Sequence, residues 1–354
     1  MALESEERTM KKKVISLMLT ALMAGTALAG CSSDGGSTSG SSASGNSSAS
    51  VAESVSDSGE GQTFTIGVCQ QLEHAALDAA TQGFQDACEE LFGEGNVTVN
   101  VQNGQNEQSN CATIANDFVA QDVDLILANG TTALQCAAAA TNTIPILGTS
   151  ITDYGTALDI SDWTGTTGTN ISGTSDLAPI DEQEDMLVEL LPDVKKVGIL
   201  YCSAEPNSEY QANLFAEALE EDGIEYAEYT AADSNEIQSV VTNAVAECDA
   251  LYIPTDNTMA SSTEIINNVC EPAGVPIIAG EQGICSGCGI ATLSISYYDI
   301  GYKAGEMAYD ILVNGADVAT MEIESAPNVT KMYNPDLCEA LNITVPDGYE
   351  AIEE

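Results

Sequence analysis

The sequence predicts an α/β protein with two Rossmann-like lobes, each a parallel β-sheet covered by helices. Two observations lead to this prediction. Short apolar runs alternate with helical patterns of about ten or more residues, and the same alternation occurs twice along the chain. Strands that alternate with helices of this length form parallel sheets covered on both faces. Both repeats begin with a glycine inside an apolar strand, at Gly67 and at Gly198.

The first repeat is expected to form a lobe from residues 61–172 together with about 295–324. Its apolar runs predict strands at 63–68, 97–101, 124–128 and 144–147. Apolar residues at helical spacing predict the helices between them, at 73–92, 110–120 and 133–140.

The second repeat is expected to form a lobe from residues 173–294 together with about 325–354. It predicts strands at 197–201, 225–229, 250–253 and 275–279 and helices at 209–221, 236–246 and 259–270. Open α/β sheets bind ligands at the carboxyl ends of their strands. Two such lobes therefore predict a ligand site in the cleft between them.

The N-terminal segment has the pattern of a secretory signal peptide. Residues 1–9 are interpreted as an N-terminal extension, after which three lysines and a short apolar run occupy 10–30. Leu28-Ala29-Gly30-Cys31 resembles the lipobox of bacterial lipoproteins, which implies that Cys31 is lipidated. The Ser/Gly-rich residues that follow, to residue 60, predict a flexible tether. We therefore expect an extracytoplasmic protein held at the bacterial cell membrane by a lipid anchor, at the cell surface or in the periplasm.

The composition limits the chemistry of the chain. The formal net charge is −47 at pH 7, and the only basic residues after Cys31 are four lysines. Nucleic acid is therefore not an expected partner, because its binding requires neutralisation of phosphates by Lys and Arg. With no arginine in this part, a ligand carboxylate must bind to backbone N–H groups, hydroxyls, amides or a lysine.

Histidine and cysteine usage argues against a catalytic or metal site. His74 is the only histidine, so zinc sites with two or three histidines are excluded. Most of the ten cysteines after Cys31 lie singly in apolar patterns, which is typical of buried thiols. Cys285 and Cys288 are expected in a Gly-rich loop, either as a local disulfide or as two free thiols. No catalytic residue, metal or other cofactor is predicted.

An ordered set of motifs resembles the substrate-binding proteins of ABC transporters, of the tryptophan/tyrosine type. The similarity extends from about residue 63 to about residue 346. The motifs are Ile66-Gly67-Val68-Cys69-Gln70 with Glu73-His74, Asp124-Leu125-Ile126-Leu127-Ala128-Asn129-Gly130-Thr131, Ile151-Thr152-Asp153, Glu205-Pro206-Asn207-Ser208, Pro254-Thr255-Asp256-Asn257 and Tyr297-Tyr298-Asp299-Ile300-Gly301.

This resemblance implies the periplasmic-binding-protein type I fold, with three segments crossing between the lobes. It also implies an extracytoplasmic protein that delivers a small solute, an aromatic amino acid in the best-known branch, to a membrane permease with its ATPase. A monomer that closes its lobes around the ligand by a hinge motion is expected.

The motifs lie at strand ends and helix starts, where free backbone N–H groups suit a carboxylate. The carboxylate is expected near Thr131, Thr149, Ser150 or Ser208, and Thr132 is a further expected ligand contact. N-capping of the helices is the simpler interpretation of each residue taken alone.

An ammonium group needs an acceptor, and four acidic residues at strand ends are candidates: Asp153, Glu205, Asp256 and Glu281. Asn207 and Asn257 are expected to orient the ligand by amide hydrogen bonds. Gln70 is expected to face the cleft, and Tyr297 or Tyr298 to stack on an aromatic ligand. His74 is expected either to bind the ligand or to cap the first helix.

Two other classes of function were weighed against this one. An extracellular enzyme is disfavoured by the single histidine and by the absence of a Gly-x-Ser-x-Gly motif. A ligand-sensing regulator is disfavoured because no DNA-binding segment is recognisable before the lobes. Binding of a nucleoside or a sugar on the same fold is the alternative within the family.

Overall fold

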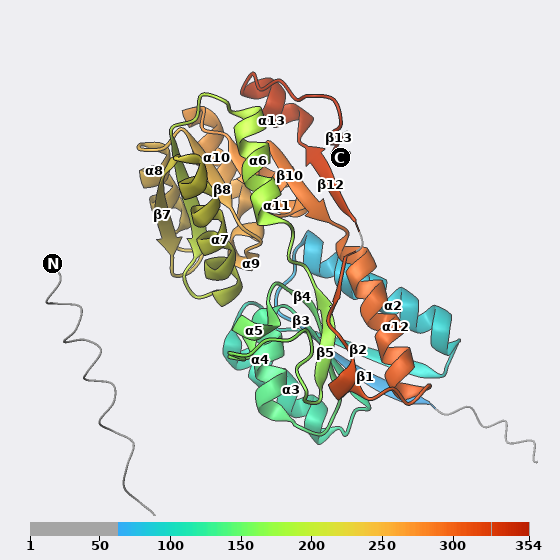
Figure 1. Cartoon of the computed structure of the whole chain (residues 1–354). Helices are drawn as coiled ribbons and strands as arrows, with labels where there is room; N and C mark the ends of the chain where they lie inside the picture. The colour runs from blue at the N-terminus through green and yellow to red at the C-terminus, as the bar shows by residue number, and fades with distance from the viewer. Residues whose placement is uncertain (1–62, 327, 354) are drawn as a thin grey trace, which may run out of the picture. The chain divides into compact units, whose positions relative to one another are not determined.

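The computed structural model describes residues 63–326 and 328–353 (Figure 1). The predicted signal peptide, the lipidation site Cys31 and the tether to residue 60 lie outside the described residues. Two separate sheets made mostly of parallel strands confirm the predicted α/β class with two lobes. None of the helices in this part of the chain is long and apolar enough to span a membrane.

The first lobe contains a six-stranded sheet in the order β11-β5-β4-β3-β1-β2. Its elements are β1 (Phe64–Gln70), α2 (Ala75–Phe92), β2 (Val97–Asn103), α3 (Gln108–Ala120), β3 (Leu125–Asn129), α4 (Thr131–Ala140), β4 (Ile146–Ile151), α5 (Tyr154–Ala157), β5 (Ile171–Ser175), α12 (Tyr297–Leu312), a 3₁₀ turn (Val318–Thr320) and β11 (Glu324–Ser325). Every strand pair in this sheet is parallel.

The second lobe contains a seven-stranded sheet in the order β13-β12-β10-β9-β8-β6-β7. Its elements are α6 (Ile180–Leu190), β6 (Lys196–Cys202), α7 (Pro206–Asp222), β7 (Glu225–Ala231), α8 (Ile237–Val245), β8 (Ala250–Ile253), α9 (Asn257–Ala260), α10 (Thr263–Ala273), β9 (Ile277–Ala279), α11 (Gln282–Cys288), β10 (Ala291–Ile295), β12 (Val329–Tyr333), α13 (Pro335–Ala340) and β13 (Glu350–Ala351). Only β12 runs antiparallel to its neighbour β10.

The two lobes repeat one strand order. The first five strands of each lobe are arranged as β2-β1-β3-β4-β5 and as β7-β6-β8-β9-β10. In both, the chain order reverses beside the first strand, which is the switch point where open α/β sheets bind ligands. The loops after β1, β3, β4 and β5 and those after β6, β8, β9 and β10 therefore supply the candidate site.

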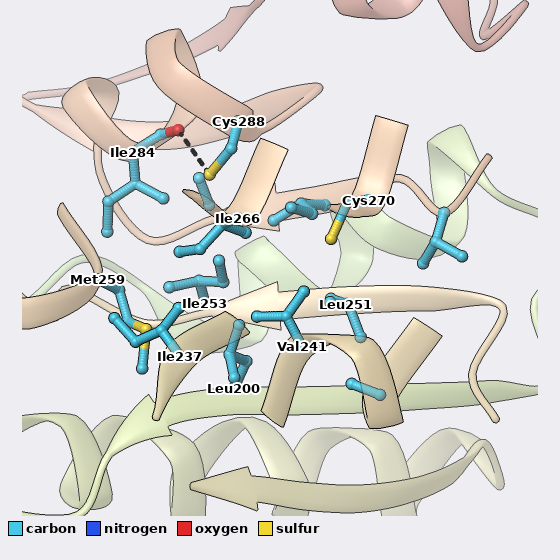
Figure 2. Close-up of a cluster of buried hydrophobic side chains, with 14 of the residues drawn as sticks. Leu200, Ile237, Val241, Leu251, Ile253, Met259, Ile266, Cys270, Ile284 and Cys288 are labelled. Atoms are coloured by element: carbon cyan, nitrogen blue, oxygen red, sulfur yellow. Dashed lines mark hydrogen bonds between the residues drawn. The ribbon is translucent and has the colours of Figure 1, made fainter. Parts of the chain in front are cut away.

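Alternating strand residues form a core on each face of each sheet. In the first lobe, Ile126 packs toward α3, α4 and α5, whereas its neighbours Leu125 and Leu127 pack toward α2 and α12. Figure 2 shows the corresponding core of the second lobe, where Leu251 and Ile253 meet α8, α9, α10 and α11. These strands are buried on both faces, as the near-continuous apolar runs predicted.

The chain crosses between the lobes three times. It leaves the first lobe after β5, returns between β10 and α12, and crosses again between β11 and β12. The strand β5 ends at Ser175, so the first lobe extends three residues past the boundary expected at 172. The strand β11, at 324–325, also belongs to the first sheet.

Helix α12 returns to the first lobe and packs closely on α2 (Figure 1). A Cβ atom at Gly301 would collide with the Ala80 carbonyl oxygen, and one at Gly83 would collide with the Tyr298 carbonyl oxygen. Glycine at both positions therefore lets the two helix backbones approach each other.

Two local expectations were wrong. Residues 259–270 are not one helix, because α9 ends at Ala260 and α10 begins at Thr263 after two serines. The Cys285–Cys288 segment is not a loop but lies in α11, where the Glu281 carboxylate accepts the backbone N–H groups of Gly283 and Ile284. This cap supplies the helix start that a Gly-rich sequence lacks on its own.

Candidate functional site

A small cavity lies at the carboxyl ends of both sheets and is the candidate ligand site. Residues from both lobes line it: His74, Leu77, Ser150, Asp176, Asn207, Thr255, Asp256, Asn257, Ala260, Glu281 and Tyr297. About 10 Å³ of it is open to the centre of a water-sized sphere, which is roughly the room for one water molecule. The lobes therefore meet around a nearly filled site.

Larger hollows occur elsewhere but lack this convergence of strand ends. One of about 410 Å³ adjoins the cavity and shares Glu281 and Tyr297 with it. Another of about 340 Å³ lies between α12 and β11. The small cavity is the better candidate because buried polar groups from both sheets meet in it.

The sequence-predicted residues divide into two groups. Six line the cavity: Ser150, Asn207, Asp256, Asn257, Glu281 and Tyr297. Seven do not: Gln70, Thr131, Thr132, Thr149, Asp153, Glu205 and Ser208.

Several of the seven make hydrogen bonds inside their own lobe. The Gln70 side chain donates to Asp78 (2.6 Å) and accepts from the Thr81 hydroxyl (2.6 Å), so it fixes the start of α2. The Thr149 hydroxyl accepts from Thr174, and Asp153 caps α5. These residues support the loops around the cavity.

The residues at the start of α4 are also occupied within the first lobe. The backbone N–H of Thr132 donates to the Gln71 side chain (2.9 Å), and the Thr131 side chain is buried. In the second lobe, the Ser208 hydroxyl accepts from Asn207 (3.3 Å).

All four predicted ammonium acceptors stabilise helix starts, Asp153 by the α5 cap described above. Asp256 accepts the backbone N–H groups of Cys202 (2.7 Å) and Met259 (2.8 Å). Glu205 accepts those of Asn257 (3.0 Å) and Thr258 (2.9 Å), at the start of α9. Glu281 caps α11. Carboxylates suit these positions because helix N-termini carry free N–H groups and a positive dipole end.

Asp176 is the residue that the sequence analysis missed. It follows β5 in the first crossing segment and is 3% exposed. Its Oδ2 atom accepts a hydrogen bond from the Tyr297 hydroxyl (2.9 Å), whereas its Oδ1 atom has no hydrogen-bond partner among the described residues. Desolvation by burial raises the Asp176 pKa to about 6, and the nearby hydroxyls of Tyr297 and Thr152 oppose that rise. An unpartnered carboxylate oxygen that lines the cavity is a free acceptor.

Ser150 supplies a second unused polar atom. It is the penultimate residue of β4 and has a left-handed backbone (φ 56°), a conformation uncommon outside glycine and often found at functional sites. Its hydroxyl is buried without a hydrogen-bond partner in the described part of the chain. This hydroxyl can therefore donate to a ligand.

Asn207 offers a donor from the other lobe. Its side-chain nitrogen makes three long contacts, to the Thr255 carbonyl (3.1 Å), the Ser208 hydroxyl (3.3 Å) and Glu205 (3.4 Å). The contacts at 3.3 and 3.4 Å are longer than the usual range of N–H···O hydrogen bonds, so they are weak. A carboxylate in the cavity would be a stronger acceptor.

The charge of the site is strongly one-sided. Asp176, Asp256 and Glu281 line the cavity, and burial raises the pKa of all three. His74 is the only lining residue that can carry a positive charge, and the described lysines that form ion pairs do so outside the cavity. The site therefore favours a ligand that brings its own cation.

The structure gives the positions of the tyrosines, the histidine and the two cysteines for which a role was predicted. Tyr297 lines the cavity, whereas Tyr298 is 38% exposed and donates to Asp86 (2.9 Å). His74 does not cap α2 with its side chain; its Nε2 atom lies 3.1 Å from Asn257 Oδ1. Cys285 and Cys288 are two free buried thiols rather than a disulfide.

Metal ligation has no structural basis in the described residues. They contain no group of three His, Cys, Asp or Glu side chains that could hold a metal ion.

Comparison with known proteins places this geometry in a family. Residues 65–351 match the family model described as ABC transporter substrate binding protein. The tyrosine-binding protein of Clostridioides difficile (strain R20291) is 35% identical over 280 residues, which cover 78% of this chain and 81% of that protein.

Two solved structures are similar over 82% of this chain. One, from Streptococcus pneumoniae and in complex with L-Trp, has a TM-score of 0.78 at 30% identity and is covered completely. The other is the ligand-free, open structure of a substrate binding protein with adhesive properties from Clostridium difficile, with a TM-score of 0.65 at 34% identity and 99% coverage. The overall structure of this chain is thus more similar to that of the L-Trp complex, although sequence identity is slightly higher to the open structure.

Proposed function

Because the chain belongs to the ABC transporter substrate binding protein family, we propose that it binds an aromatic L-amino acid, tyrosine or tryptophan, in the interlobe cavity. Members of this family pass a small molecule to an ABC permease and are not enzymes. The single observation that carries the proposal is the unpartnered Asp176 Oδ1 in an acidic cavity that no lysine or arginine lines. The names of the relatives, which bind tyrosine and L-Trp, supply the ligand class.

The α-ammonium group is assigned to Asp176. Its free oxygen is buried, and its other oxygen is held by the Tyr297 hydroxyl (2.9 Å). A charge-assisted hydrogen bond there would neutralise a carboxylate that is costly to bury alone. Neither Glu205 nor Asp256 is as available, because both are occupied by helix N–H groups.

The α-carboxylate is assigned to the Ser150 hydroxyl and the Asn207 side-chain amide. Ser150 belongs to the first lobe and Asn207 to the second. A carboxylate between them would connect the two lobes, so binding favours closure. Leu77, Ala260 and the Tyr297 ring are the apolar surfaces available to the ligand side chain.

The cavity must enlarge to admit an aromatic amino acid. Its present room is close to that of one water molecule. We propose that the structure represents a closed state and that ligand enters when the lobes separate, as in hinge closure. The higher TM-score to the L-Trp complex than to the open relative supports this view.

Membrane attachment and assembly are part of the same proposal. Lipidation of Cys31 would anchor the mature chain, and the Ser/Gly-rich residues to 60 would tether the two lobes outside the cytoplasm. The two lobes form a complete site within one chain, so we propose a monomer. Metabolic labelling with a palmitate analogue, lost in Cys31→Ser, tests the anchor.

Calorimetric titration of the folded part of the chain tests the ligand. We expect binding of L-tyrosine or L-tryptophan, and loss of binding for tyramine, which lacks the carboxylate, and for 3-(4-hydroxyphenyl)propionate, which lacks the ammonium. Asp176→Asn should weaken L-amino-acid binding at least about 30-fold, since a buried charge-assisted bond contributes about 2 kcal/mol or more. The matched control, Asp153→Asn, removes an equal charge at a neighbouring strand end and should bind normally. Binding only of nucleosides or sugars would refute the ligand assignment.

A further inference from the structure

A continuous chain of hydrogen bonds joins the two lobes beside the cavity. The Thr132 backbone N–H donates to Gln71 Oε1 (2.9 Å), and Gln71 Nε2 donates to Asn106 Oδ1 (3.1 Å). Asn106 Nδ2 then crosses to the second lobe and donates to Thr258 Oγ1 (3.0 Å), whose hydroxyl donates to Glu205 Oε1 (2.7 Å). We call these four bonds the interlobe relay.

The direction of the relay is fixed at both ends. The backbone N–H of Thr132 can only donate, and a carboxylate at Glu205 can only accept. Gln71, Asn106 and Thr258 lie between them, and the side chain of each accepts one bond and donates the next, so all the bonds run toward Glu205. In such a chain each hydrogen bond polarises the next, so the loss of one bond weakens the others.

Glu205 also orients the second contact between the lobes. Asn257 Nδ2 donates to Glu205 Oε2 (2.7 Å), which turns Asn257 Oδ1 toward His74 Nε2 at 3.1 Å. His74 is therefore the donor in this contact, because the facing amide atom is an oxygen. Both polar contacts from the first lobe to α9 thus depend on one carboxylate.

Glu205 is placed to act on closure without touching the ligand. It is 4% exposed and is not among the residues that line the cavity. Its oxygens accept five hydrogen bonds, from the backbone and side chains of Asn257 and Thr258 and weakly from Asn207.

We propose that Glu205 is a positioning residue that orients Asn257 and Thr258 to hold the lobes closed, and so sets how long the ligand is retained. This inference rests on the proposed function for its ligand but concerns the lifetime of the closed state. Retention and ligand choice are thereby assigned to different residues: Glu205 acts on closure, whereas the cavity residues act on recognition.

The first test is the dissociation rate of L-tyrosine from Glu205→Gln, measured by stopped-flow displacement. A glutamine places an NH₂ group where one oxygen now accepts, so one of the two contacts from the first lobe to α9 loses its orientation. We expect dissociation about tenfold faster, with unchanged relative affinities for tyrosine, tryptophan and phenylalanine. Glu209→Gln, an equal charge change at an exposed position of α7, should dissociate like the wild type.

The second test separates the relay from a general loss of stability. Asn106→Ala removes one interlobe bond from the first lobe, and it should also accelerate dissociation. Combined with Glu205→Gln it should add less than its separate effect, because both changes interrupt one chain of bonds. Fully additive effects, a wild-type dissociation rate in Glu205→Gln, or altered ligand preference would overturn the proposal.

Small-angle X-ray scattering without ligand keeps the two proposals distinguishable. A larger radius of gyration in Glu205→Gln than in wild type would support the relay even if no aromatic amino acid binds. Equal radii together with equal dissociation rates would overturn it while leaving the proposed ligand intact. Should Glu205→Gln fail to fold, an unchanged dissociation rate in both Asn106→Ala and His74→Ala would overturn it as well.

Discussion

Ligand affinity should fall in acid because Asp176 must lose its proton to pair with an ammonium group. Burial raises its pKa to about 6 in the ligand-free protein, and a bound ammonium would lower that pKa again. Binding therefore releases a proton below pH 6, and the affinity should fall about tenfold for each pH unit below that value. Between pH 7.5 and pH 5 the dissociation constant should rise about tenfold.

Several groups around Asp176 affect how steeply the ligand affinity changes with pH. The Glu281 charge contributes to the raised Asp176 pKa, and the Tyr297 hydroxyl bond opposes it. Asp256 and His74 also line the cavity. The ligand does not contribute, because the ammonium and carboxylate of a free amino acid stay charged across this range. The variant Asp176→Asn isolates the contribution of one residue.

Calorimetry at four pH values, repeated in buffers of different ionisation enthalpy, measures both the affinity and the proton released. The wild type should release a proton at pH 5.5 and almost none at pH 7.5. Asp176→Asn should bind weakly with a flat pH profile. A wild-type affinity that does not change between pH 7.5 and pH 5 would refute the assignment, and so would an Asp176→Asn variant that keeps the full slope.

Three further predictions concern stability and reactivity. The ligand-free protein should melt at a higher temperature at pH 5.5 than at pH 7.5, because burial raises the pKa of Asp176 to about 6 and that of Glu184 to about 7. The folded state then binds more protons than the unfolded state between about pH 4 and pH 7, so its stability is lost as pH rises through this window; the opposite order of melting temperatures would contradict it. Gly301→Ala should destabilise the protein by about 2 kcal/mol or more in urea titration, since its Cβ would collide with the Ala80 carbonyl, whereas Lys303→Ala on the same helix should cost less than about 0.5 kcal/mol. A thiol reagent should leave all ten described cysteines unmodified in the native state and modify them after denaturation, because each is buried and free; rapid native labelling would show that these thiols are accessible.

The fold could be predicted because apolar strand runs and helical spacing agree throughout both lobes. The runs at 124–128 and 250–253 become central strands buried on both faces. The strand β5 was not predicted, since its sequence Ile171-Ser-Gly-Thr-Ser175 contains one apolar residue and gains its burial from neighbouring elements. Missing that strand meant missing Asp176, which lies at its carboxyl end.

The site was predicted only in part for a second physical reason. Position at a strand end does not distinguish a carboxylate that binds a ligand from one that caps a helix. Glu205 and Asp256 have the same sequence context as a ligand contact, yet their oxygens are filled by N–H groups of the chain itself. The sequence does not reveal which hydrogen bonds form in the folded chain, and those bonds leave one oxygen of Asp176 without a partner among the described residues.

The return of α12 to the first lobe has a consequence for the order in which the chain can fold. Ala304, Met307 and Ala308 complete the core that β1, β3 and α2 begin, although β3, the last of these segments, ends at Asn129 and α12 begins only at Tyr297. During synthesis the first lobe lacks this helix until the ribosome has passed residue 312, by which time nearly all of the second lobe has been made. Early chains therefore expose an unfinished apolar face, which delays stable folding.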